Sequence, residues 1–240
     1  MNRTAIESLG YEVREIPPYT VVYHPSLPQL PDLLSGGPAP GTDTDMRGRA
    51  SIRLMEPGLV VRTLTHGGAL RKVFKMRFLT LNRSLQELES SAYLISQGIP
   101  TPEIVGLRFR KSGMFYAMEI ISRMIPDSVD LLAFLEQCPG NGSAVIRKTG
   151  ALIRDIHLAQ VYHADLHVKN IVLDKDRNPW IIDLDNAYRF IDLPVVLRYK
   201  NTRRFIHSLK KWDKRGRIRL PRGWKQTFME GYTGQSRQGL

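Results

Sequence analysis

The sequence lacks several features, and each lack excludes a class of protein. It contains one cysteine, Cys138, so no disulfide can form within the chain, which is typical of a reducing compartment. No apolar run approaches the roughly 20 residues that a helix needs to span a bilayer. The opening stretch MNRTAIESLGYEVREIPP is too polar for the apolar core of a secretory leader, so we expect a cytoplasmic protein.

Acidic side chains are scarce relative to basic ones. The chain has 23 Asp and Glu against 35 Lys and Arg, a formal net charge of +12 at pH 7. The excess gathers over residues 203–225, where Asp213 is the only acid. Such a positive field favours the binding of polyanions, whether nucleic acid, anionic lipid headgroups or an acidic substrate. A basic face that contacts only solvent is the alternative interpretation. Beyond Trp212 and Trp224 this tract offers little for base stacking, so no nucleic acid is expected.

The first half of the chain has the pattern of strands with one helix. Residues 25–48 are rich in Pro, Gly, Ser and Thr, which is typical of a loop. Strands are expected on either side of the Pro57-Gly58 turn and over 103–110 and 114–122. A helix is expected at 83–97, where apolar residues recur at helical spacing.

The second half is expected to be mainly helical, with one hairpin. Helices are expected over 130–137, 143–161, 200–213 and 221–232. A linker near 120–127 divides an α+β fold into two lobes. The N-terminal lobe is expected over 1–122, with 1–46 partly loop or extension, and the C-terminal lobe over 123–240.

Polar side chains interrupt short apolar runs between residues 161 and 187, and carboxylates there are costly unless something compensates them. Transfer of phosphate from ATP needs a carboxylate that accepts the proton of the attacking hydroxyl, and oxygen ligands for Mg²⁺. Asp165 suits the base. Asn170 and Asp183 suit the metal, since a hairpin between them brings both to one side.

The stretch HADLHVKN, residues 163–170, resembles the catalytic loop H-x-D-L-x-x-x-N of the protein-kinase-like superfamily. Asp183 stands where that superfamily has the first residue of D-F-G. The resemblance implies a bilobal protein-kinase-like fold, with a strand-rich N-lobe that carries one αC-type helix and a mainly helical C-lobe. It implies that Asp165 is the catalytic base, that Asn170 and Asp183 hold Mg²⁺, and that His163 supports the loop.

The sequence also departs from the protein-kinase pattern. His167 stands where protein kinases usually carry lysine, Leu184-Asp185 replaces Phe-Gly, and no A-P-E element follows. The elements that dock peptides are therefore missing. We expect a small-molecule or lipid acceptor rather than a protein.

A narrower resemblance covers about residues 47–232. It is carried in order by RGRASIRL, LVVRTLTHGG, LQELESSAYLISQGIPTPE, HADLHVKNIVLD, IIDLDNA and NTRRFIHSLKKW, with a terminal GY. Together these resemble the Kdo kinase/heptose kinase family, bacterial enzymes that phosphorylate inner-core sugars of lipopolysaccharide. The resemblance implies ATP and Mg²⁺ as cofactors and, as acceptor, a lipid-linked anionic sugar such as Kdo attached to lipid A.

The same resemblance assigns residues of the N-terminal half to ATP. Glu87 corresponds to the αC glutamate, and Arg62 to the cation that pairs with it and contacts the α- and β-phosphates. An arginine supplies the same positive charge as the lysine usual at this position and can bind in a bidentate manner, but its side chain has a different reach. Lys72 and Lys75 are alternatives for this cation.

Three further residues receive roles from the resemblance, each with a plainer alternative. Gly48 would turn the loop over the phosphates, or simply begin a strand. Glu119 and Ile120 would form the hinge whose backbone meets adenine, while Glu119 is equally explained as an inert linker acid.

Two other interpretations concern the same region. His157, His163 and His167 suggest a zinc site, but no cysteine accompanies them and their spacing straddles a helix end, so packed histidines are expected. Asp185 would assist the metal or the acceptor, or form an ion pair with a neighbouring arginine.

These observations predict an ATP- and Mg²⁺-dependent kinase of the lipopolysaccharide inner core, held peripherally at an anionic inner membrane by electrostatics. A heptose kinase, a minimal protein kinase and an aminoglycoside kinase are alternative enzymes. A net charge of +12 opposes a polycationic aminoglycoside substrate. A pseudokinase or basic binding module is the non-enzymatic alternative, opposed by the intact Asp165, Asn170 and Asp183.

Overall fold

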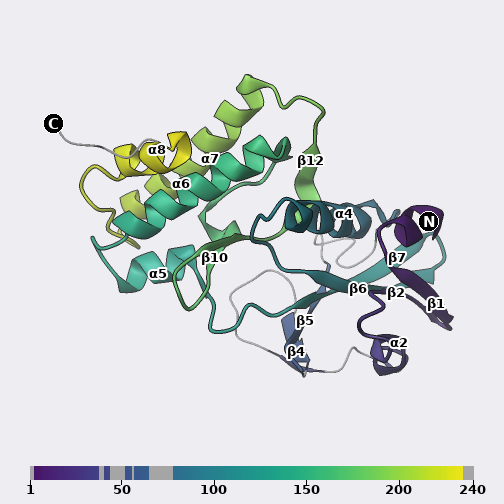
Figure 1. Cartoon of the computed structure of the whole chain (residues 1–240). Helices are drawn as coiled ribbons and strands as arrows, with labels where there is room; N and C mark the ends of the chain where they lie inside the picture. The colour runs from purple at the N-terminus through teal and green to yellow at the C-terminus, as the bar shows by residue number, and fades with distance from the viewer. Residues whose placement is uncertain (1–2, 38–40, 44–51, 56, 65–77, 235–240) are drawn as a thin grey trace. The chain divides into compact units, whose positions relative to one another are not determined.

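The computed structural model describes residues 3–37, 41–43, 52–55, 57–64 and 78–234 (Figure 1). The chain divides into two compact units. The first comprises Met1–Ala92 and Glu103–Met124, and the second comprises Tyr93–Pro102 and Ile125–Leu240. The division expected at residue 122 differs from this one over Tyr93–Pro102, because Leu94 and Ile99 pack in the core of the second unit.

One antiparallel sheet organises the first unit, and its seven described strands lie in the order β1-β2-β6-β7-β5-β4-β3. The strands are β1 (Glu12–Ile16), β2 (Tyr19–Tyr23), β3 (Thr42–Asp43), β4 (Ile52–Met55), β5 (Leu59–Thr63), β6 (Ile104–Ser112) and β7 (Phe115–Arg123). The helices are α1 (Arg3–Ser8), α2 (Leu30–Leu33) and the first part of α4 (Asn82–Ser96).

Both faces of this sheet are apolar and covered. Successive residues of a strand point to opposite faces, and in β2 the buried Val22 belongs to a cluster with Leu88 of α4. Its neighbour Val21 belongs to a second cluster with Leu30 of α2. The sheet is therefore a layer between two helices, which fixes the positions of the side chains at its edges.

The N-terminal residues form part of the sheet. Residues 1–46 were expected to be partly loop or extension, yet β2 pairs with β6 in a register that places Val22 opposite Leu107. The Tyr11 hydroxyl donates to the Ile104 carbonyl oxygen and ties this segment to β6. The expected loop at 25–48 also contains α2 and β3.

The second unit is mainly helical. Its helices are α5 (Leu131–Gln137), α6 (Ser143–Leu158), η2 (Val168–Asn170), η3 (Leu184–Asn186), α7 (Val195–Lys214) and α8 (Trp224–Thr233). Short strands form two small sheets, in the orders β11-β10-β8 and β12-β9. They are β8 (Val129–Asp130), β9 (Val161–His163), β10 (Ile171–Leu173), β11 (Pro179–Ile181) and β12 (Ala187–Arg189).

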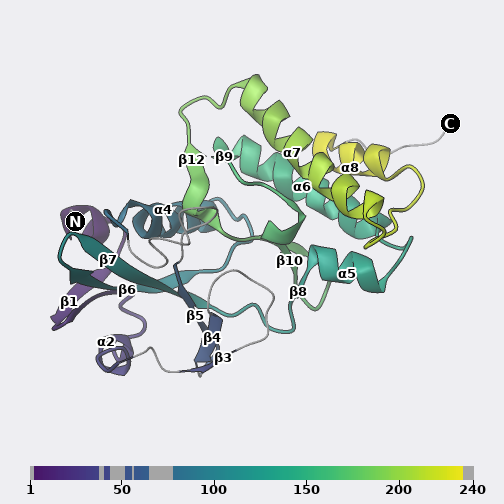
Figure 2. The same ribbon diagram turned by 180° about the vertical axis from the view of Figure 1, so that it is seen from behind.

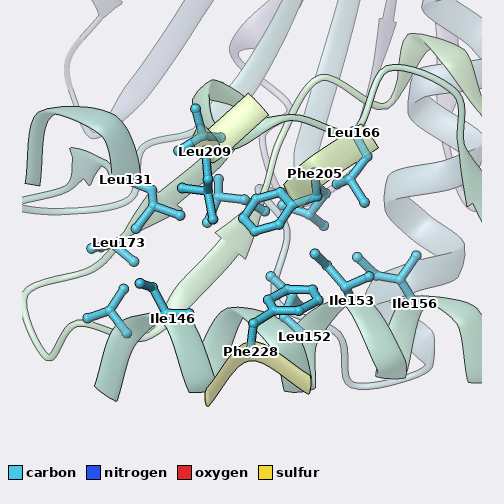
Figure 3. Close-up of a cluster of buried hydrophobic side chains, with 14 of the residues drawn as sticks. Leu131, Ile146, Leu152, Ile153, Ile156, Leu166, Leu173, Phe205, Leu209 and Phe228 are labelled. Atoms are coloured by element: carbon cyan, nitrogen blue, oxygen red, sulfur yellow. The ribbon is translucent and has the colours of Figure 1, made fainter. Parts of the chain in front are cut away.

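An apolar stripe on α6 builds the core of this unit. The stripe has helical spacing, and its buried residues include Val145, Ile146, Leu152, Ile153 and Ile156. The stripe packs against α7 and α8, where the rings of Phe205 and Phe228 stack with centroids 5.4 Å apart (Figure 3). Sequence periodicity predicted α6 and α8 well, whereas α7 begins at Val195 after Pro194 rather than near residue 200.

Two glycines let α6 and α8 approach each other closely. A Cβ at Gly150 would overlap the Phe228 carbonyl oxygen and lie 3.0 Å from the Tyr232 nitrogen. A Cβ at Gly231 would overlap the Arg147 carbonyl oxygen in the same way. Each glycine is therefore required by the backbone of the facing helix. Among the described helices, none has both the length and the apolar character needed to cross a membrane.

Candidate active site

An ion pair links β5 to α4 in the first unit. Arg62 Nη2 donates to both carboxylate oxygens of Glu87, 2.5 Å to Oε2, and the Glu87 side chain is 8% exposed. A charge as buried as this needs a partner. The predicted pairing of Arg62 with Glu87 is confirmed, whereas Gly48, Lys72 and Lys75 lie outside the described residues.

The expected hinge residues belong to a strand instead. Glu119 and Ile120 lie inside β7, paired on one side with β5 and on the other with β6. Their backbone groups lie in a strand paired on both sides, so the prediction that this backbone meets adenine is wrong. The strand continues to Arg123, and the Glu119 side chain pairs with the buried Arg108 at 2.5 Å. The first unit ends at Met124, four residues after the predicted hinge.

Local pairing in the second unit brings the predicted catalytic segments together. Backbone hydrogen bonding between β10 and β11 extends one residue beyond the paired strands, since the Ile182 N–H donates to the Asn170 carbonyl oxygen at 3.0 Å. Asp183 follows Ile182 directly. In the other small sheet His163 pairs with Ala187 across β9 and β12, so Asp165 and Asp185 each lie two residues beyond that pair.

Asp165 lies in the loop after β9, beside Arg204 and His167. Arg204 of α7 donates from Nη1 to Asp165 Oδ1 at 2.6 Å, and His167 Nε2 lies 3.5 Å from Oδ2. The hydrogen bond from His167, together with the charges of His167 and Arg204, lowers the pKa of Asp165 although partial burial opposes this. Asp165 is thus held as an ionised, half-exposed carboxylate.

The His163 ring joins the backbones of the two predicted catalytic segments. It is almost completely buried; Nδ1 accepts the Asp165 N–H at 3.3 Å, and Nε2 lies 3.3 Å from the Ile182 carbonyl oxygen. Only a neutral ring protonated on Nε2 satisfies both partners. Desolvation by burial lowers the pKa of His163 and favours the same form. The ring fixes the distance between the segments that carry Asp165 and Asp183.

Two residues of α7 take part in this site and were not identified from the sequence, Asn201 and Arg204. Asn201 is 1% exposed. Its Oδ1 accepts from the backbone N–H of His163 at 3.1 Å, and its Nδ2 donates to the backbone carbonyl oxygen of His163 at 2.7 Å. His157 Nε2 lies 3.2 Å from the same Oδ1, and its Nδ1 lies 2.8 Å from the Tyr232 hydroxyl. A polar residue at a core position of a helix was the available signal, because Asn201 lies one turn before the buried Phe205.

Asn170 is oriented by the loop that carries Asp165. Its side chain is buried, and Nδ2 donates to the Asp165 carbonyl oxygen at 3.1 Å, which leaves Oδ1 as the group for a cation. Asp183 has a left-handed backbone conformation, with φ 65° and ψ 57°, at the start of η3. An amide oxygen and a carboxylate are hard oxygen donors of the kind Mg²⁺ prefers. The donor set therefore fits the predicted metal.

Asp185 and His167 complete the surroundings. Asp185 is 4% exposed and its Oδ1 accepts from Asn186 Nδ2 at 2.7 Å. His167 has a buried Nδ1 with no hydrogen-bond partner among the described residues. A buried polar atom of this kind is costly without a partner. Because Nε2 of the neutral ring donates to Asp165, Nδ1 is an acceptor, and it fits a bound water that donates to it.

The comparisons with known proteins point to one family. The lipopolysaccharide kinase (Kdo/WaaP) family matches residues 45–232. A 3-deoxy-D-manno-octulosonic acid kinase of Vibrio cholerae is 33% identical over 129 residues, 54% of this chain and 54% of the relative. A second, from Vibrio parahaemolyticus, is 30% identical over 155 residues, 63% of this chain and 64% of the relative. This chain therefore spans between about half and two thirds of the length of these relatives.

A solved structure has the same fold. It is described as WaaP in complex with acyl carrier protein, and it matches with a TM-score of 0.53 at 20% identity, over 98% of this chain and 83% of that one. The match confirms the predicted α+β, kinase-like fold. Because the family match extends over most of the chain, including both the Arg62–Glu87 pair and the catalytic loop, this protein belongs to the lipopolysaccharide kinase (Kdo/WaaP) family.

Proposed function

We propose that this protein is a kinase that phosphorylates a sugar hydroxyl of the lipopolysaccharide inner core, with Kdo attached to lipid A as the acceptor. The observation that carries the proposal is the joining of Asp165, Asn170 and Asp183 by the His163 ring and the β10–β11 hairpin in a member of this family. The names of the matched relatives supply the choice of Kdo.

Asp165 acts as the base in this proposal. It orients the acceptor hydroxyl and takes its proton as the oxygen attacks the γ-phosphorus of ATP, the bond to the bridging oxygen breaks and ADP leaves. Arg204 and His167 keep the carboxylate ionised and fix its direction. His167 lies two residues after the base, and its buried Nδ1 has no hydrogen-bond partner among the described residues.

Asn170 and Asp183 would hold Mg²⁺ through the amide and carboxylate oxygens. When bound, the ion supplies neutralisation of the charge on the phosphates. In the first unit, Arg62 would contact the α- and β-phosphates while Glu87 fixes its guanidinium. These assignments support ATP as the phosphate donor.

The positive net charge of the chain suits an anionic acceptor. A sugar acid on a phosphorylated lipid is anionic, and the net charge of +12 attracts both it and an anionic bilayer. The protein is accordingly proposed to work at the cytoplasmic face of the inner membrane as a peripheral protein.

A transfer assay tests the acceptor. The purified protein is incubated with γ-labelled ATP, Mg²⁺ and one of three acceptors, which are Kdo-bearing lipid A, a heptosylated core and a basic protein. The proposal expects label on the Kdo-bearing lipid. Label on the heptosylated core alone favours a heptose kinase, label on the basic protein favours a protein kinase, and label on none contradicts an enzymatic role.

A thermal-shift assay tests the cation site independently of the acceptor. ATP with Mg²⁺ is expected to raise the melting temperature of the wild type and to have little effect on Asp183→Asn. Asp176→Asn is the matched control, because Asp176 is an exposed acid in the turn between β10 and β11. Equal shifts in all three proteins would exclude Asp183 as a ligand.

A further inference from the structure

Large apolar side chains are exposed around the start of α7. Of the twelve large hydrophobic residues exposed in the described parts of the chain, five lie within residues 188–199, so their exposure is clustered. Ile191 is 103% exposed and Val195 79%, and Tyr188, Val196 and Tyr199 complete the set. Singly exposed apolar residues need no explanation, whereas a cluster marks a binding surface.

The loop that carries Ile191 is anchored on both sides. The Gln160 carbonyl oxygen accepts the Phe190 N–H at 2.9 Å, and Gln160 Oε1 accepts the Leu193 N–H at 2.7 Å. The Leu193 side chain is buried, and its carbonyl oxygen accepts Arg198 Nε at 3.0 Å. The chain is thus fixed one residue before and two residues after Ile191, and the fold itself holds this side chain out in solvent.

Basic residues surround the exposed set. Residues 188–204 contain five arginines and lysines and one acid, Asp192, whose carboxylate lies 4.0 Å from the Arg198 guanidinium. Lys200 and Arg203 lie on the exposed face of α7, one turn beyond Val196 and Tyr199. The surface is therefore an apolar tip at the start of α7 followed by a cationic band along the same helix, whose course Figure 2 shows.

We propose that this tip, Ile191, Val195, Val196 and Tyr199, inserts into the interface of an anionic lipid bilayer, with Lys200 and Arg203 on the headgroups. Apolar side chains with adjacent cations are the composition of interfacial membrane elements, and Tyr is common at the headgroup level. A bilayer accepts a small protruding tip without shape complementarity. A stable protein interface buries about 800 Å² on each partner, more than a few tip residues supply.

The tip lies on the same helix as Arg204, so its insertion would place Asp165 close to the membrane surface. This step rests on the proposed function. Arg204, which contacts Asp165, lies nine residues after Val195, or about 14 Å along the helix. Insertion of the first turn therefore keeps the catalytic carboxylate near the headgroups. A sugar attached to a lipid headgroup is presented at that level.

Vesicle flotation without ATP or acceptor tests the insertion. The wild type is expected to bind vesicles of phosphatidylcholine with phosphatidylglycerol more tightly than phosphatidylcholine alone. The double variant Ile191→Ser/Val195→Ser is expected to lose about tenfold or more in partition coefficient, because both apolar side chains leave the interface. Leu33→Ser/Met114→Ser is the matched control, since both residues are exposed in the first unit, and it is expected to bind like the wild type.

Fluorescence tests the depth. Ile191→Trp is expected to show a blue-shifted emission on vesicle addition and quenching by brominated lipids, above the background of the three native tryptophans. Equal binding by the double variant and the wild type, or an unchanged Ile191→Trp spectrum, would overturn the proposal. Binding to an acidic polypeptide such as polyglutamate, with none to vesicles, would overturn it in favour of an acidic protein partner.

Activity separates this inference from the proposed function. With a deacylated, water-soluble Kdo acceptor, the double variant is expected to transfer phosphate as fast as the wild type. On acceptor embedded in vesicles it is expected to be slower. Vesicle binding without transfer to any acceptor supports the insertion and contradicts only the proposed reaction.

Discussion

Arg204 Nη1 lies 2.6 Å from Asp165 Oδ1, although the two residues are 39 positions apart in the chain. Both side chains are about half exposed, at 49% and 51%, so the pair contributes at most about 1 kcal/mol to stability. Its effect is on direction, because it holds one carboxylate oxygen and leaves Oδ2 toward His167. Arg204 therefore positions the proposed base.

Arg204→Gln is expected to slow phosphate transfer with little loss of stability. A displaced base costs about 10² in rate for about 1 Å of misplacement, and we expect a decrease in kcat of between about tenfold and that value. Lys211→Gln removes the same charge from an exposed position two turns further along α7 and is expected to leave kcat unchanged. Equal effects of the two substitutions would assign the loss to net charge.

The Arg62–Glu87 pair is expected to show strong coupling in a double-mutant cycle. Arg62→Met leaves the buried Glu87 carboxylate uncompensated and is expected to cost about 2–4 kcal/mol in the free energy of unfolding. Arg62→Met/Glu87→Leu removes both charges and is expected to recover much of this loss. Urea unfolding of the wild type, the two single variants and the double variant measures the coupling. A double variant as unstable as the sum of the single ones would contradict the pairing.

Gly150→Ala is expected to destabilise the second unit by about 1–3 kcal/mol, because its Cβ overlaps the Phe228 carbonyl oxygen and the backbones of α6 and α8 must separate. The control is Gly36→Ala, where a Cβ meets nothing within 4 Å. Thermal unfolding compares the two variants. Equal melting temperatures would show that the helices do not meet through this glycine.

Stability is expected to fall in mild acid because of the buried His157. Burial lowers its pKa from 6.5 to about 4. Above pH 6.5 the ring is neutral in both states and the full stability is present. Between pH 6.5 and 4 the unfolded chain takes up a proton that the folded chain does not, so the free energy of unfolding falls by at most about 3 kcal/mol. Desolvation acts on His163 in the same direction.

Unfolding experiments at pH 7 and pH 5 test this proton linkage. His157→Gln is expected to have a smaller difference between the two pH values than the wild type, whatever its absolute stability. His207→Gln, at an exposed position of α7, is expected to keep the wild-type difference. A wild-type pH dependence retained in His157→Gln would assign the effect to other groups.

The proposed catalytic segment could be identified in the sequence because the contacts that assemble it are local. Asp165, Asn170 and Asp183 lie within one loop and one hairpin, where residue types and spacing fix the geometry. Asn201 and Arg204 reach the same loop from α7, and no local pattern connects them with it. Tertiary contacts of this kind become visible only in the structure.

Two predictions for the first unit, the hinge and the N-terminal loop, differ from the structure. The strand expected over 114–122 agrees closely with β7, Phe115–Arg123, and the hinge at Glu119 and Ile120 was placed inside that strand rather than after its end. The strands β1 and β2 are short and partly polar, and their sequence pattern is weak; they are held in the sheet because β2 pairs with β6 and β1 pairs with β2. The helix at 83–97 was predicted closely because its apolar spacing extends over four turns.

The central claim is that Asp165 is the base of a phosphate transfer, and single-turnover transfer from ATP by Asp165→Asn tests it most directly. Asparagine keeps the shape but cannot take the proton, so the rate is expected to fall by about 10²–10⁴-fold. Thermal stability and ATP binding are expected to stay close to those of the wild type, and Asp176→Asn is expected to react normally. Undiminished transfer by a folded Asp165→Asn protein would contradict the account.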